Sequence, residues 1–336
     1  MKSRNSSIEA LRLFCILGIL CMHLSGIYME SSNPVTLIQL NLINSLFNIC
    51  VTCFILISGY FGLTRKFDKL FSLWCLVMFY SLSGAAFSYL IEGSISITDL
   101  FKSVFPTITS KYWYFTTYVL LSLFAPYINE IPKRFSKKDF EHFLLLLIIV
   151  FYLFPTFFFY EIIKDNGKGP VNMFIVYLIG RYIAAYRKDI AINKLKYLLS
   201  FFVIIFTAFA GNLAASLFRH RSFAPFARDN SLFMLAGAIA LFAIIRNCHF
   251  QSKVINLLAK NILAVYIGEV ILRRLAIIHL PLSDFDGKWL LLPAVMALAV
   301  LIMLSLSLVE VLRKTIFHRL EEFITAKIRS STSSTS

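Results

Sequence analysis

The chain has 336 residues, of which 58% are hydrophobic and 15% charged, and its mean hydropathy is +0.75. This composition excludes an ordinary soluble domain and is typical of a polytopic membrane protein. The net charge of +15 does not indicate nucleic-acid binding, because no basic soluble segment is long enough to form the required surface. The six cysteines lie mostly within apolar runs, and we interpret Cys50 and Cys53 as packing residues despite their metal-like spacing.

Apolar segments long enough to cross a bilayer follow one another along the chain. They cover about 8–28, 38–62, 70–90, 112–130, 140–160, 171–187, 196–217, 231–246, 254–278 and 289–311. The first segment is too long for the apolar part of a typical signal peptide, and no cleavage site follows it. We therefore expect that no signal peptide is removed. The sequence therefore predicts an all-α, polytopic integral membrane protein with about ten transmembrane helices.

The charges of the connecting loops predict the orientation of these helices. With a cytoplasmic N-terminus, the basic loops, such as residues 64–69, face the cytoplasm, and the acidic loops, such as residues 161–165, face outside. Both termini are then cytoplasmic. The exception is a basic cluster after the seventh segment, which contains Arg219, Arg221 and Arg228.

The end of the chain differs in composition from the rest. Residues 316–327 mix apolar and charged side chains in a pattern that suits a short amphipathic helix on the inner membrane surface. Residues 330–336 form a Ser/Thr tail, which we expect to be disordered. We therefore predict a transmembrane domain over residues 1–315 and a separate C-terminal region over residues 316–336.

The first apolar segment carries Arg12 and His23, and ionisable side chains inside a membrane are costly and functional by default. Eleven residues at about 100° each bring the two onto one helix face, about 16 Å apart along the axis. This is about the reach of a pantetheine arm, so we hypothesise that Arg12 holds the anionic end of an acyl-CoA and His23 meets its thioester. The alternatives are an arginine that reaches the lipid headgroups and a histidine that satisfies a polar contact.

Several stretches together resemble one known family. Residues 8–12 (IEALR), followed by ten residues and His23, resemble the opening helix of the membrane-bound acyltransferase-3 family, which modifies bacterial surface polysaccharides and lipids. Residues 54–61 (FILISGYF), 112–127, 180–182 and 259–269 resemble later family motifs in the same order, the second especially those of exopolysaccharide and O-antigen acetyltransferases. Ser58 and Gly59 in the first of these stretches also predict close approach of another helix.

The resemblance implies that Arg12 and His23 are catalytic, and further cations are candidates for binding the donor. Arg181 lies within the sixth segment, where it can hold a CoA phosphate or pair with Glu9 or Glu310. Three cations after the second segment can hold CoA phosphates or act only as a topology signal; they are Arg65, Lys66 and Lys69.

Aromatic residues and one acidic residue are candidates for binding the acceptor. Trp113, Tyr114 and Tyr118 open the fourth segment, where we expect them at the outer face, either stacking on a sugar ring or forming an interfacial belt. Glu269 stands where the family often has a histidine. It can pair with Arg273, orient the catalytic histidine or contact a sugar hydroxyl.

The resemblance implies transfer of an acyl group, most often acetyl, from cytoplasmic acyl-CoA to a hydroxyl of a lipid-linked or surface polysaccharide. The donor is then acetyl-CoA, the acceptor a saccharide, and the location the bacterial cytoplasmic membrane. His23 would take the proton of the hydroxyl, or carry the acyl group covalently in a variant mechanism. No metal is expected, because the histidines lack ligand spacing. The alternatives are a lipid-linked saccharide flippase and a polysaccharide polymerase.

Overall fold

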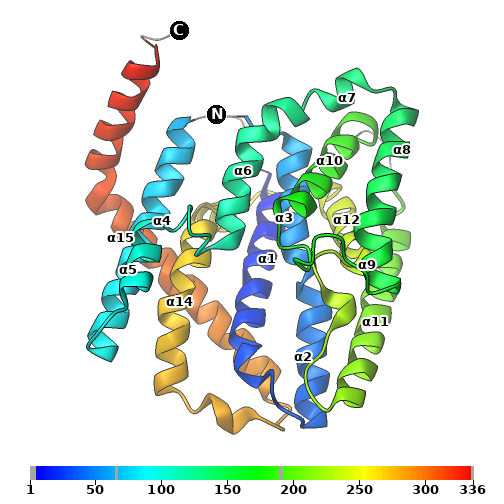
Figure 1. Cartoon of the computed structure of the whole chain (residues 1–336), viewed down its shortest axis with the longest axis horizontal. Helices are drawn as coiled ribbons and strands as arrows, with labels where there is room; N and C mark the ends of the chain where they lie inside the picture. Colours follow the sequence, from blue (N-terminus) through cyan, green and yellow to red (C-terminus); the bar gives the residue numbers. More distant parts are fainter. Residues whose placement is uncertain (1–4, 65–66, 189–191, 334–336) are drawn as a thin grey trace.

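The structure is a computed structural model that describes the backbone of residues 5–64, 67–188 and 192–333, and side chains as far as Phe317. Within these ranges it contains helices and no strand, which confirms the all-α prediction. Figure 1 shows the helices side by side in a bundle, with the start of α1 and the end of α15 toward the same end. We call this end the terminal end of the bundle.

A helix is present at each of the ten predicted positions. In chain order these are α1 (Ser6–Ser25), α2 (Pro34–Phe47) with α3 (Ile49–Phe61), α4 (Phe67–Glu92), α6 (Trp113–Ile128), α8 (Lys137–Ile148) with α9 (Phe154–Phe157), α10 (Pro170–Tyr186), α11 (Lys194–Arg219), α12 (Leu232–Arg246), α13 (Lys253–Leu258) with α14 (Ile262–His279), and α15 (Leu291–Ser333). Two short helices, α5 (Ile97–Val104) and α7 (Ile131–Arg134), lie in connections.

Seven of these positions hold helices that are long and apolar enough to cross a membrane in the described part of the chain. The other three helices, α6, α10 and α12, have 16, 17 and 15 residues. The multi-pass membrane class is therefore confirmed, whereas the count of ten spans and their orientation stay predictions. The last helix runs without interruption to Ser333, so the helix continues into the part of the predicted tail that the structure describes.

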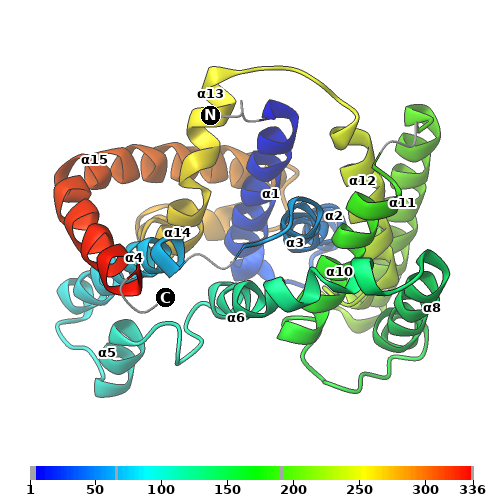
Figure 2. The same ribbon diagram turned by 90° about the horizontal axis from the view of Figure 1, so that it is seen from above.

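Helix α1 lies near the centre of the bundle, where it packs against α2, α3, α14 and α15. Figure 2 shows α4, α14 and α15 on one side of α1 and α10, α11 and α12 on the other. Its first turn is fixed because the Asn5 side chain accepts a hydrogen bond from the Ser7 backbone N–H. Leu11, Cys15 and Leu20 are buried, whereas Arg12 and His23 are half-buried.

The tightest helix contact joins α3 and α10, and it confirms the close approach predicted at Ser58 and Gly59. A methyl group on Gly59 would lie 2.3 Å from the carbonyl oxygen of Tyr177, and one on Gly180 would lie 2.7 Å from that of Leu56. No side chain larger than hydrogen fits at either position without moving a backbone. Two glycines therefore set the distance between these helices.

The second span is broken in its middle at Asn48, which ends α2 and begins α3. The Asn48 side chain donates a hydrogen bond to the carbonyl oxygen of Ala227, in the connection between α11 and α12. Since the middle of a span touches this connection, the connection folds into the bundle instead of covering its end. Figure 1 also shows the connection from α9 to α10 at mid-height.

The connection between α14 and α15 is tied to the start of α2, far from the terminal end. Ser31 and Thr36 donate hydrogen bonds of 2.7 and 2.6 Å to Oδ1 of Asp286. These hydrogen bonds favour the charged carboxylate and lower the pKa of Asp286. The starts of the second and last spans are thereby linked at this end of the bundle.

Candidate active site

A cavity of about 680 Å³ lies along α1, between α3, α6 and α14. Its wall contains Arg12 and His23 of α1, as their shared helix face predicted. Other members of the wall that matter below are Asn44, Asn48, Trp113, Tyr114, Tyr118, Lys168, Asp229, Lys260, Tyr266 and Arg273. The cavity is large enough for a small-molecule ligand.

A hydrogen-bonded chain of three side chains reaches the cavity through His23. Nδ1 of His23 lies 3.0 Å from Oε1 of Glu269, whose Oε2 accepts a hydrogen bond of 2.9 Å from Nε of Arg273. A carboxylate only accepts hydrogen bonds, so we assign the proton to Nδ1 and a free lone pair to Nε2. Among the described residues, Nε2 has no hydrogen-bond partner.

The three hydrogen-bonded side chains differ in burial in a way that suits chemistry at the histidine. The Glu269 side chain is 3% exposed, whereas those of His23 and Arg273 are 39% and 31% exposed. The buried carboxylate fixes the ring, and the ring edge is open to the cavity. Gly268 helps to place the carboxylate, because a methyl group there would lie about 3 Å from Leu306 and Tyr80. Close packing of α14 against α4 and α15 thus holds Glu269 toward α1.

Arg12 forms the other charged point on the α1 face. Its Nη1 lies 3.3 Å from Oε1 of Glu9, three residues earlier in the chain, so the two residues form an ion pair within α1. The Arg12 side chain is 32% exposed and lines the cavity, so part of its guanidinium is open to a ligand. Lys260, at the start of α14, lies in the same wall and is exposed. Two cations therefore face this cavity from different helices.

The aromatic residues Trp113, Tyr114 and Tyr118 also line the cavity. Figure 1 shows α6 in the half of the bundle that contains the terminal end. Arg12 is close enough to both tyrosines to interact with them electrostatically. The two tyrosine rings are stacked, with centroids 6.2 Å apart. Helix α6 begins at mid-height in the bundle (Figure 1), and the predicted outer-face position and acceptor binding of these residues stay predictions.

Of the remaining predicted cations, the two that the structure describes, Arg181 and Lys69, are not in the cavity wall described above. Arg181 donates a hydrogen bond of 3.3 Å to the carbonyl oxygen of Gly59 and packs against Gly62, at the end of α3. Lys69 is exposed near the start of α4 and is not among the cavity residues described. Arg65 and Lys66 lie outside the described residues. Donor binding by these four residues stays a prediction.

The cavity also contains polar residues that the sequence did not single out. They are Asn44 and Asn48 from the break between α2 and α3, and Lys168 and Asp229 from two connections. Their signal in the sequence is weak, because an uncharged amide in an apolar segment is less conspicuous than a charge, and loop charges only predict topology. Only the inward fold of the connections brings them to the cavity. The described residues contain no group of three side chains arranged to hold a metal ion.

The comparison with family models identifies the class of protein to which the chain belongs. A model described as "Acyltransferase domain", that of the acyltransferase-3 family, matches residues 5–308, nearly the whole described chain. The chain belongs to the acyltransferase-3 family. No curated protein and no solved structure matches it.

Membership makes the chain a membrane acyltransferase, as the resemblance implied. The matched range contains both α1 residues and Glu269, so the described cavity lies entirely within the acyltransferase domain. The departure at Glu269 leaves this acyltransferase with a carboxylate where many relatives have an imidazole. In this structure the carboxylate binds the catalytic candidate His23 directly.

Proposed function

We propose that this protein transfers an acyl group, acetyl in the simplest case, from acyl-CoA to a hydroxyl of a cell-surface or lipid-linked saccharide in the bacterial cytoplasmic membrane. The observation that carries the proposal is the pair of hydrogen bonds that link Arg273 to Glu269 and Glu269 to His23, at a cavity of an acyltransferase domain. A histidine held by a buried carboxylate is an arrangement suited to general base catalysis.

In the proposed transfer, His23 alone accepts the proton of the acceptor and returns it to the leaving group. The Nε2 lone pair takes the proton of the acceptor hydroxyl while the hydroxyl oxygen attacks the thioester carbonyl carbon. The tetrahedral intermediate collapses, the carbon–sulfur bond breaks, and the leaving CoA thiolate takes the proton back from Nε2. Glu269 stabilises the imidazolium that exists between these steps, and Arg273 keeps the carboxylate in place.

Arg12 and Lys260 are the groups best placed to bind the anionic part of the donor. The axial distance from Arg12 to His23 is about 16 Å, which suits an extended pantetheine arm with its thioester at the histidine. A planar guanidinium and a lysine ammonium both bind phosphate. Tyr114 and Tyr118, beside Arg12, supply apolar surface along the same path. Acetyl-CoA is therefore the donor to test first.

The proposal is tested by measuring CoA release from acetyl-CoA in membranes that contain the protein or its His23→Ala variant. We expect release to fall to the level of membranes without the protein. His279→Ala is the matched control, because this exposed histidine at the end of α14 lies away from the cavity wall described above. Release that does not depend on His23 would exclude the mechanism. A protein that never consumes acetyl-CoA while the saccharide crosses the membrane would be a transporter.

A further inference from the structure

Asp229 carries a buried carboxyl group in the wall of the same cavity. It is not one of the three hydrogen-bonded residues His23, Glu269 and Arg273. It is 3% exposed, and among the described residues its Oδ1 has no hydrogen-bond partner. Leaving a buried carboxyl oxygen unpaired is costly. The residue lies in the connection between α11 and α12 and contributes to the cavity lining. An unpaired acceptor at a cavity wall indicates a ligand that donates hydrogen bonds.

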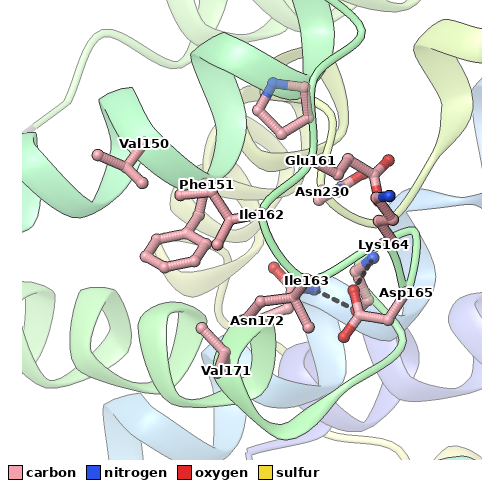
Figure 3. Close-up of a pocket in the computed structure, with 12 residues that line it drawn as sticks. Val150, Phe151, Glu161, Ile162, Ile163, Lys164, Asp165, Val171, Asn172 and Asn230 are labelled. Carbon is pink, nitrogen blue, oxygen red and sulfur yellow. Dashed lines mark hydrogen bonds between the residues drawn. The ribbon is translucent and has the colours of Figure 1, made fainter.

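The backbone around Asp229 is fixed by contacts on both sides. Arg228 pairs with Glu161 and donates to the carbonyl oxygen of Pro155, and the Asn48 side chain holds Ala227. The small pocket shown in Figure 3 is lined by the connection before α10 and by Asn230, and Asp229 is not part of its wall. A ligand of Asp229 would therefore occupy the main cavity.

The same contacts account for one member of the basic cluster predicted after the seventh segment. Arg228 is neutralised by Glu161, and Arg219 packs over the ring of Phe223 with its guanidinium 3.7 Å from the centroid. These contacts occupy both cations with partners in the fold. They are therefore not the groups through which an acceptor is recognised.

Asp229 lies with other polar groups that together suit a neutral ligand. Asn44 and Asn48, one helical turn apart, line the cavity, and the exposed Lys168 enters it from the connection before α10. A carboxylate and an ammonium in one wall disfavour a ligand of either net charge. Hydroxyl groups donate to a carboxylate or amide oxygen and accept from an amide or ammonium nitrogen. This set therefore matches a polyhydroxylated, uncharged molecule.

The set comes from other elements than the donor groups. The cavity lining continues along the chain past His23 to Gly26 and Met29, away from Arg12. The backbone N–H of Ser222, in the connection that carries Asp229, donates to the carbonyl oxygen of Met29. From there the connection runs into the bundle, where the Asn48 side chain donates to the carbonyl oxygen of Ala227, so Asp229 reaches the cavity beside the break in the second span.

We propose that Asp229, with Asn44, Asn48 and Lys168, forms the acceptor subsite and binds the hydroxyl groups of an uncharged saccharide ring. The inference rests on the proposed function and names the part of the cavity that selects the acceptor. In this arrangement the aromatic residues beside Arg12 serve the donor path. The acceptor reaches His23 from the end of the bundle opposite to the terminal end.

The test compares Asp229→Asn and Lys168→Ala with wild type in two measurements. The first is the O-acetyl content of the surface polysaccharide in the native host, and the second is acetyl-CoA affinity of the purified full chain in lipid nanodiscs by calorimetry. We expect each variant to lower O-acetylation about tenfold, since it removes hydrogen bonds of a charged group to the acceptor. Acetyl-CoA affinity should stay within about twofold of wild type.

Asp284→Asn is the control, because it makes the same change at an exposed position in the α14–α15 connection. The subsite is excluded if both variants acetylate the polysaccharide as wild type does, or if acetyl-CoA affinity falls in step with O-acetylation. Lys168→Ala guards against misfolding, since that side chain is exposed. If wild type itself neither binds acetyl-CoA nor acetylates the polysaccharide, the proposed function fails, which is a separate outcome.

Discussion

Glu269 stands where the resemblance leads us to expect a histidine, and it contacts the candidate catalytic histidine directly. Its carboxylate accepts from Nδ1 of His23 with one oxygen and from Arg273 with the other. The i, i+4 spacing of Glu269 and Arg273 makes their pairing predictable from the sequence. The contact with His23 joins residues 246 positions apart, so only the folded bundle shows it.

Replacing Glu269 with Gln tests its role as a positioning residue. The amide keeps the shape of the side chain but cannot balance the charge of the imidazolium, and it can stabilise the wrong tautomer of His23. We expect kcat to fall about a hundredfold or more, with KM for acetyl-CoA within about twofold of wild type. Glu92→Gln is the matched control, since Glu92 in α4 pairs with Arg274, an arginine of the helix that carries Glu269. An unchanged kcat in Glu269→Gln would contradict this role.

Arg12 and Arg181 are both arginines within predicted spans, yet the structure gives them different surroundings. Arg12 faces the cavity, whereas Arg181 binds the backbone at the end of α3. We expect Arg12→Ala to weaken acetyl-CoA binding about tenfold to a hundredfold, because a charge-assisted contact to phosphate is lost. Arg181→Ala should lower the thermal midpoint and leave binding unchanged. Calorimetry that shows the reverse order would assign the phosphate contact to Arg181.

At the scale of the helices, the sequence predicted well where each helix lies along the chain. It did not predict where a helix begins or breaks within the bundle. Apolar runs place a helix at each predicted position because length and hydropathy decide whether a segment is buried in lipid. The same runs do not report that α6 begins inside the bundle or that α2 and α3 break at Asn48. These features depend on tertiary partners, such as Ala227 for Asn48.

The end of the chain illustrates a different limit. The Ser/Thr composition predicted disorder after residue 330, whereas α15 continues to Ser333. Helix formation at a chain end depends on the helix that precedes it, because adding a turn to an existing helix costs far less than starting one. Composition alone does not contain that information. The division at residue 316 stays a prediction.

The contact of α3 with α10 gives a prediction at the same scale. In Gly180→Ala the added methyl group would lie 2.7 Å from the Leu56 carbonyl oxygen and 2.8 Å from Gly59 Cα, so the helices must separate. We expect a loss of about 1–3 kcal/mol of stability, measured as a lower thermal midpoint in detergent. Gly84→Ala is the control, since its nearest neighbour, Ile271, would be 3.9 Å away. Equal midpoints for the two variants would show that α3 and α10 do not need this contact.

At the scale of the whole molecule, the cavity combines two kinds of polar group around His23. Arg12 and Lys260 are cations that share the wall with aromatic rings, and the proposed acceptor subsite contains two amides, a carboxyl group and a lysine. With the predicted orientation, in which the terminal end is cytoplasmic, a donor from the cytoplasm and an acceptor from outside meet at one histidine. The acyl group would then cross the membrane within the protein.

The most direct test of this account is the O-acetyl content of the surface polysaccharide in the native host, measured by NMR. Cells that carry His23→Ala at wild-type protein level should export the polysaccharide without the acetyl groups that this enzyme adds. Cells that carry His279→Ala should retain them. Acetyl groups that persist in the His23→Ala cells would contradict the central claim that His23 transfers the acyl group.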